Sequence, residues 1–124
     1  MTHARSILMT AVMALAAAPP AAWAQSYPVS GKWTYENAAA EGPAKDCGRR
    51  YVTFQGRQRF DTGGGVPSYR NISVDNIGND TYRIVDEFAT GQINARSNYT
   101  LRQVDSDHIV MQVAGHTITL RRCQ

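Results

Sequence analysis

Residues 108–122 read HIVMQVAGHTITLRR, and they predict a β-hairpin. If Ala114-Gly115 is a two-residue turn, one face of the two arms is mostly apolar. The facing pairs on it are Val113 with His116, Met111 with Ile118, and Ile109 with Leu120. The other face carries mainly polar side chains. A shift of one residue would turn these apolar side chains to solvent. The pattern therefore specifies this register, with the apolar face toward a core.

The strand expected before this hairpin is Ile93–Val104, which alternates in the same way. The loop at residues 105–107 places Leu101 opposite Met111, and Tyr99 opposite Val113. Upstream, residues 69–75 and 81–88 are expected to pair around a turn at residues 77–79, with Ile72 facing Ile84, Val74 facing Tyr82 and Arg70 facing Asp86. Shorter strands are expected at residues 31–37, 49–55 and 57–61.

No helical periodicity is sustained from Gly31 onward. Short turns join most of the expected strands, and longer connections occur only at Ala38–Gly48 and Thr62–Ser68. We therefore predict an all-β fold, an antiparallel up-and-down barrel of about eight strands, because closure removes both unpaired edges. A two-sheet sandwich is the alternative.

Residues 1–24 have the zones of an export signal. A basic start is followed by an apolar core at residues 7–18, a break at Pro19-Pro20, and the cleavage pattern Ala22-Trp23-Ala24. The apolar core is shorter than the roughly 20 residues that a membrane-spanning helix needs. We expect cleavage near Ala24, a periplasmic or secreted product that does not span a membrane, and a single barrel domain over residues 25–124.

The mature chain has a weak net charge. The whole chain has 13 Lys and Arg against 10 Asp and Glu, and the signal removes only Arg5, which leaves a net charge of +2. The basic residues are scattered, so they give no reason to expect a nucleic-acid partner. Local pairs, among them Arg57 with Arg59, are interpreted as solvated surface.

Cys47 and Cys123 are the two cysteines of the chain. An even count in a small exported domain predicts a disulfide, and only one pairing exists. In the chain-entropy model, a cross-link over so long a loop stabilises the fold by about 4 kcal/mol.

Gly31-Lys32-Trp33 opens the first expected strand. Together with the meander, a late arginine and a disulfide to the C-terminus, this G-x-W resembles the lipocalin-like small barrels of the calycin group. The resemblance implies that Trp33 closes one end of the barrel and packs beneath Arg121 or Arg122, in a cation–π contact.

Two relatives of that group are also similar to this chain. Residues 31–34 resemble the opening of the avidins, but the later tryptophans that would wall a biotin pocket are absent. The small periplasmic metalloprotease inhibitors are similar in size, export, single disulfide and early G-x-W. Their N-terminal tail enters the protease; here residues 25–30 form a short tail, and Cys123 departs from their cysteine placement.

The function expected from these features is non-catalytic binding, with an unknown small apolar ligand or a protein as the partner. The side chains expected to line a ligand site inside the barrel are Trp33, Tyr35, Phe54, Tyr82, Phe88, Tyr99 and Met111. The alternative is a protease-inhibitor-like protein that binds a protein partner through its N-terminal tail or through rim loops at residues 38–45 and 62–68. An apolar cavity of a few hundred Å³ or more would favour the small-molecule binder, and a dry, packed core would favour the partner-binding protein.

We expect no catalytic residue, metal or cofactor, and a monomer. The hairpin register turns His108 to the outer face beside Arg121, where we expect solvent and no group that orients the imidazole as a general base. His108→Ala is therefore expected to change stability by no more than about 0.5 kcal/mol.

Overall fold

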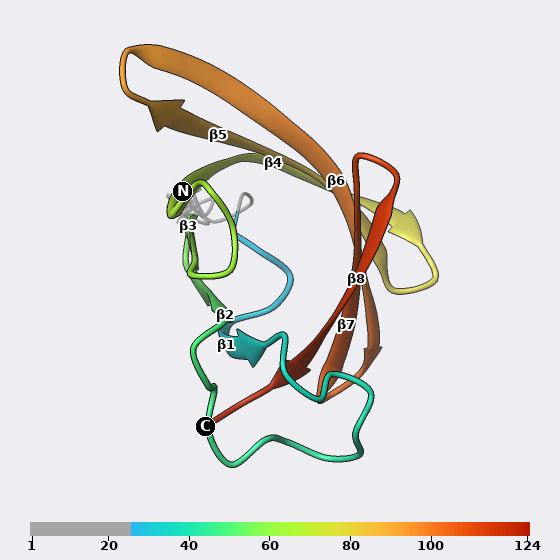
Figure 1. Cartoon of the computed structure of the whole chain (residues 1–124). Helices are drawn as coiled ribbons and strands as arrows, with labels where there is room; N and C mark the ends of the chain where they lie inside the picture. Colours follow the sequence, from blue (N-terminus) through green and yellow to red (C-terminus); the bar gives the residue numbers. More distant parts are fainter. Residues whose placement is uncertain (1–25) are drawn as a thin grey trace, which may run out of the picture.

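The computed structural model describes residues 26–124, which form a closed antiparallel barrel without helices (Figure 1). Every strand pairs with the next along the chain, and β8 returns to pair with β1 through Trp33 opposite Arg122. The predicted barrel is confirmed, and the sandwich is excluded. The strands are β1 (Gly31–Thr34), β2 (Tyr51–Gln55), β3 (Gln58–Asp61), β4 (Ser68–Gly78), β5 (Thr81–Thr90), β6 (Ile93–Asp105), β7 (His108–Val113) and β8 (His116–Arg122).

The last three strands have the predicted register. Met111 lies opposite both Leu101 on β6 and Ile118 on β8, and Val113 lies opposite both Tyr99 and His116. Ala114 and Gly115 both have positive φ, as a tight hairpin turn between strands requires. Apolar side chains of β6, β7 and β8 consequently share the inner face of the barrel.

The predicted register between β4 and β5 is wrong. Val74, not Ile72, lies opposite Ile84, because the turn consists of Asn79 and Asp80 rather than residues 77–79. Both turn residues have a φ of 54°, a conformation that Asn and Asp adopt more readily than other side chains do. Irregularities at two places along β4 shift the pairing further, so that Asn71 faces Asp86.

One end of the barrel, where β1 begins and β8 ends, is closed by packed side chains. Trp33 is fully buried there, and the Arg122 guanidinium lies 4.4 Å from its ring centroid. The Trp33 indole donates a hydrogen bond to the Ser30 carbonyl. Tyr27 and Val29, which precede β1, are buried in the same core. The position that the resemblance implied for Trp33 is confirmed, with Arg122 as the arginine.

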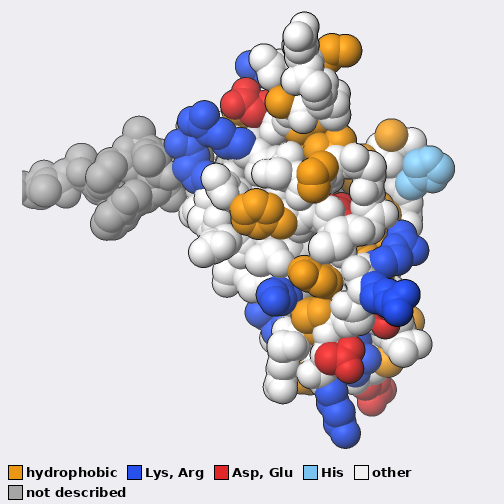
Figure 2. Space-filling model, turned by 60° about the vertical axis from the view of Figure 1, so that its left-hand side comes forward, with side chains coloured by type: hydrophobic (Ala, Val, Ile, Leu, Met, Phe, Trp, Pro, Cys, Tyr) orange, Lys and Arg blue, Asp and Glu red, His pale blue; other side chains and the backbone are white. Residues whose placement is uncertain are grey.

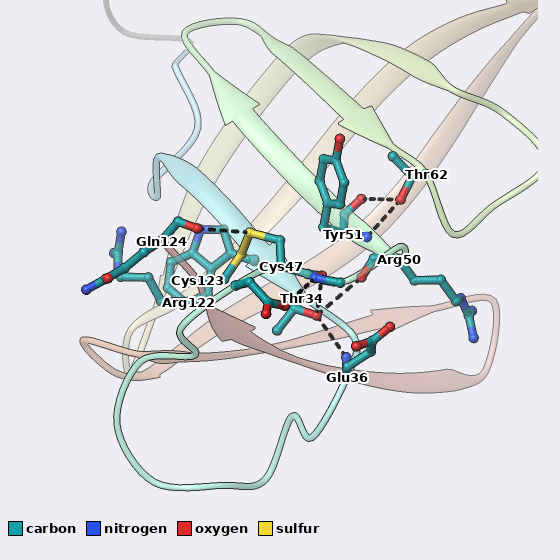
Figure 3. The surroundings of a disulfide bond; sticks show 12 residues. Thr34, Glu36, Cys47, Arg50, Tyr51, Thr62, Arg122, Cys123 and Gln124 are labelled. Atoms are coloured by element: carbon teal, nitrogen blue, oxygen red, sulfur yellow. Dashed lines mark hydrogen bonds between the residues drawn. A yellow bond between two sulfur atoms is a disulfide. The ribbon is translucent and has the colours of Figure 1, made fainter.

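The long connection between β1 and β2 lies against the outside of the barrel rather than standing away from it. The disulfide joins Cys47 to Cys123, as predicted (Figure 3). Thr34 is buried beneath the connection and donates a hydrogen bond to the Cys47 carbonyl at 2.9 Å. Arg121 donates hydrogen bonds to the carbonyl groups of residues 41–43. This segment is therefore fastened along its length.

The surface has no single strongly basic region on the face drawn in Figure 2. Lys and Arg side chains lie there in several separate groups, with Asp and Glu among them. No helix in residues 26–124 is long and apolar enough to span a membrane. The predicted export signal lies outside the described residues.

Candidate binding site at the open end of the barrel

A cavity of about 370 Å³ lies at the end opposite Trp33, where β1 and β3 end and β8 begins. Its two walls differ in chemistry. Met111, Val113 and Ile118 line it from β7 and β8. The polar and aromatic wall comes from β1, β3, β4 and their connections, and consists of Tyr35, Arg50, Arg59, Asp61 and Tyr69. The barrel is thus packed at one end and hollow at the other.

The polar wall rests on a buried ion pair inside the barrel. Arg59 is 4% exposed and donates its Nε–H to Oδ2 of Asp86 at 3.1 Å. Asp86 is fully buried, and it also accepts hydrogen bonds from the Tyr99 hydroxyl at 2.8 Å and the Asn71 amide at 3.2 Å. Three donors around one carboxylate offset the cost of removing its charge from water.

Aromatic rings enclose the guanidinium of Arg59. The guanidinium carbon lies 3.7 Å from the ring centroid of Tyr69 and 5.0 Å from that of Tyr99. The negative ring faces favour the cation in this position. Burial raises the pKa of Tyr99 well above its usual value, so its hydroxyl keeps the proton that it donates to Asp86.

Asp61 links this cluster to the rim of the cavity. Its two oxygens accept hydrogen bonds from the Tyr35 hydroxyl at 2.9 Å and from the Gly63 amide at 2.8 Å. Burial and the charge of Asp61 raise the pKa of Tyr35, which therefore remains a donor. A side chain at position 63 would collide with the Tyr35 ring, because a Cβ there would lie 2.8 Å from it. The short rim segment therefore needs glycine at this position.

The structure separates the seven side chains predicted to bind a ligand. Tyr35 and Met111 line the cavity. Tyr99 belongs to the polar cluster beneath it, while Trp33 and Phe54 belong to the packed core. Tyr82 is half-buried against that core, and Phe88 packs edge-on against Tyr69. The other cavity residues were not predicted.

The interpretation of Arg59 as solvated surface is wrong, and the burial of Asp61 was not predicted. The register between β2 and β3 pairs Phe54 with Arg59 and Val52 with Asp61, so all four side chains point inward. Phe60 points outward in consequence and is 37% exposed. A two-residue turn at Gly56-Arg57, like the one at Ala114-Gly115, predicts this register from the sequence and so turns Arg59 and Asp61 to the inner face.

His108 also differs from the prediction. It lies on the outer face opposite Arg121, as expected, but its imidazole has partners. Nδ1 lies 2.8 Å from the Asp105 carboxylate, and Nε2 lies 2.7 Å from the Ala40 carbonyl. Asp105 and His108 are a facing pair across the turn, which brings their side chains together. Because both ring nitrogens contact acceptors, His108 fastens the connection at Ala40.

The fold and site define a closed eight-stranded barrel with one packed end and one cavity-bearing end. Comparisons with protein-family models, curated proteins and solved structures find no match to this chain. Within residues 26–124, no group of three or more His, Cys, Asp or Glu side chains is placed to hold a metal ion. Functional inference therefore rests on the cavity itself.

Proposed function

We propose that the mature chain is an exported, non-catalytic, lipocalin-like binding protein that takes a small molecule into the open end of its barrel. The observation that carries this proposal is the lining of the cavity of about 370 Å³, which includes the buried inner-face side chains of Arg59, Asp61 and Met111; its volume is within the usual range for small-molecule sites. Its contrast between an apolar wall and a polar wall suits an amphipathic molecule. A monomer without cofactor or nucleic acid suffices for this function.

Export is supported by two independent features. Residues 1–24 have the zones of a cleavable signal. A disulfide joins Cys47 to Cys123, and disulfides persist in oxidising compartments such as the periplasm or the cell exterior. We therefore propose a periplasmic or secreted location.

The protease-inhibitor alternative is less well supported. A free N-terminal tail is what would enter a protease cleft, yet Tyr27 and Val29 are each only 7% exposed and belong to the core. The connection at residues 38–45, one of the two rim loops expected to bind a partner, is held by Arg121, His108 and the adjacent disulfide. Both segments would have to leave their contacts in order to enter a partner.

Fluorescence titration of the mature chain with N-phenyl-1-naphthylamine, an uncharged aromatic probe, tests the proposal. We expect saturable binding that is lost in Ile118→Trp, because a larger side chain on the apolar wall fills the cavity. Gln112→Trp is the matched control, since Gln112 is exposed on the outside of the neighbouring strand. An unchanged melting temperature shows that each variant is folded. Absence of binding, or equal binding by both variants, would refute the proposed site.

A further inference from the structure

Hydrogen-bond donors exceed acceptors at the polar wall of the cavity. Both oxygens of Asp86 and both oxygens of Asp61 already accept hydrogen bonds from side chains or backbone of the barrel. Each of these four oxygens therefore already has a partner within the barrel. A ligand donor group would have to compete with partners that are already in place.

Arg59 is in the opposite situation. Within residues 26–124, its Nε–H donates to Asp86, and no other carboxylate or carbonyl oxygen accepts a hydrogen bond from this side chain. Its Nη1 lies 3.8 Å from Oδ2 of Asp61, a distance that allows charge attraction but exceeds a hydrogen bond. The side chain is nevertheless almost fully removed from water and lines the cavity. Its terminal nitrogens are not among the fully buried atoms that lack a partner, so acceptor oxygens of a ligand in the cavity can reach them and replace water there.

Arg50 supplies a second guanidinium at the rim of the same cavity. It lies 5.1 Å from the ring centroid of Tyr35 and is exposed. In the described part of the chain its side chain makes no hydrogen bond. Without Arg50, the single positive charge of Arg59 would face the two negative charges of Asp61 and Asp86. The positive charge of Arg50 balances the second carboxylate.

We infer that the cavity recognises the oxyanion group of a small amphipathic molecule through Arg59 and Arg50, while Met111, Val113 and Ile118 contact its apolar part. Guanidinium groups present paired N–H donors that match the oxygens of a carboxylate or sulfonate. This assignment rests on the proposed function, because it names the ligand class of that same cavity.

A matched pair of probes tests the ligand class. 8-Anilinonaphthalene-1-sulfonate has the ring system of N-phenyl-1-naphthylamine with one added sulfonate. We expect the mature chain to bind the sulfonate probe about tenfold more tightly, or more, the factor that one charge-assisted hydrogen bond supplies. 1-Naphthoate, a carboxylate, should displace it, whereas sodium sulfate at equal ionic strength should not.

Three variants locate the effect. Arg50→Gln and Arg59→Lys should each remove most of the preference for the sulfonate probe over the uncharged probe, measured as the ratio of the two affinities in each variant. Arg102→Gln, on the exposed outer face of β6, is the charge-matched control and should leave the preference unchanged. If Arg59→Lys does not fold, Arg50→Gln decides alone.

The outcomes separate the two proposals. Equal affinity for both probes, or a preference that survives Arg50→Gln in the folded protein, overturns the oxyanion assignment but leaves the binding site standing. Failure of both probes to bind refutes the proposed function and with it this inference.

Discussion

Replacement of Arg59 by Met removes the guanidinium that donates to the buried carboxylate of Asp86. The two side chains are 5% and 0% exposed, so solvent does not screen their interaction. Breaking such a pair from one side costs about 3–5 kcal/mol, compared with about 0–1 kcal/mol for an exposed pair. Met approximates the length of the Arg stem, so the substitution leaves only a small change in packing.

Urea unfolding of the mature chain measures this cost. Thermal unfolding is the second measurement. For a domain of this size, 1 kcal/mol shifts the melting temperature by roughly 4–8 °C, so Arg59→Met should melt at least about 12 °C lower than the unsubstituted protein. Asp86→Asn should also be destabilised, because it removes the carboxylate that accepts from Arg59 and leaves this buried charge only the 3.8 Å contact with Asp61. The double variant buries neither charge and should lose less than the sum of the single variants, by about 2 kcal/mol.

Two results would refute this reasoning. Single variants that each lose less than about 1 kcal/mol would mean that the pair is effectively solvated. Single losses that simply add in the double variant would mean that Arg59 and Asp86 do not interact.

Three further predictions concern the packed end and its outer connection. Trp33→Ala should cost about 3–5 kcal/mol, since the ring is fully buried, and an unchanged melting temperature would place it at the surface. NMR titration should find the pKa of His108 above 6.5, because Asp105 and the adjacent carbonyl stabilise the imidazolium. The stability that His108 contributes should therefore be complete below pH 6.5 and lost as pH rises through the folded pKa, a dependence that His108→Gln should abolish. Thiol labelling of the denatured, unreduced protein should find neither Cys47 nor Cys123 free, and reduction should destabilise the fold by about 4 kcal/mol.

The barrel was predictable wherever apolar alternation and turn length agreed. Ile109, Met111 and Leu101 fix the register of β6 to β8 because a shift would expose all of them. The same approach failed between β4 and β5, where Asn79-Asp80 is the true turn and irregularities alter the pairing. Local patterns do not reveal such irregularities, which depend on neighbouring strands.

The cavity was only partly predictable, for a different reason. Tyr35 and Met111 were identified from their aromatic or apolar character on inward positions. The turn at Gly56-Arg57 would have placed Arg59 on the inner face, but its charge argued against burial, because the partner that neutralises it, Asp86, lies two strands away. His108 was misjudged because facing residues across a tight turn lie closer than their spacing in the sequence suggests.

Methyl NMR during titration with N-phenyl-1-naphthylamine tests the central claim, a ligand site at the open end, most directly. Met111 and Ile118 line the cavity, so the NMR signals of their methyl groups should shift in a saturable manner. Those of Ile109 and Leu120, fully buried in the packed core, should change little. Saturable shifts at the core pair or on the outer face, with Met111 and Ile118 unmoved, would contradict the account.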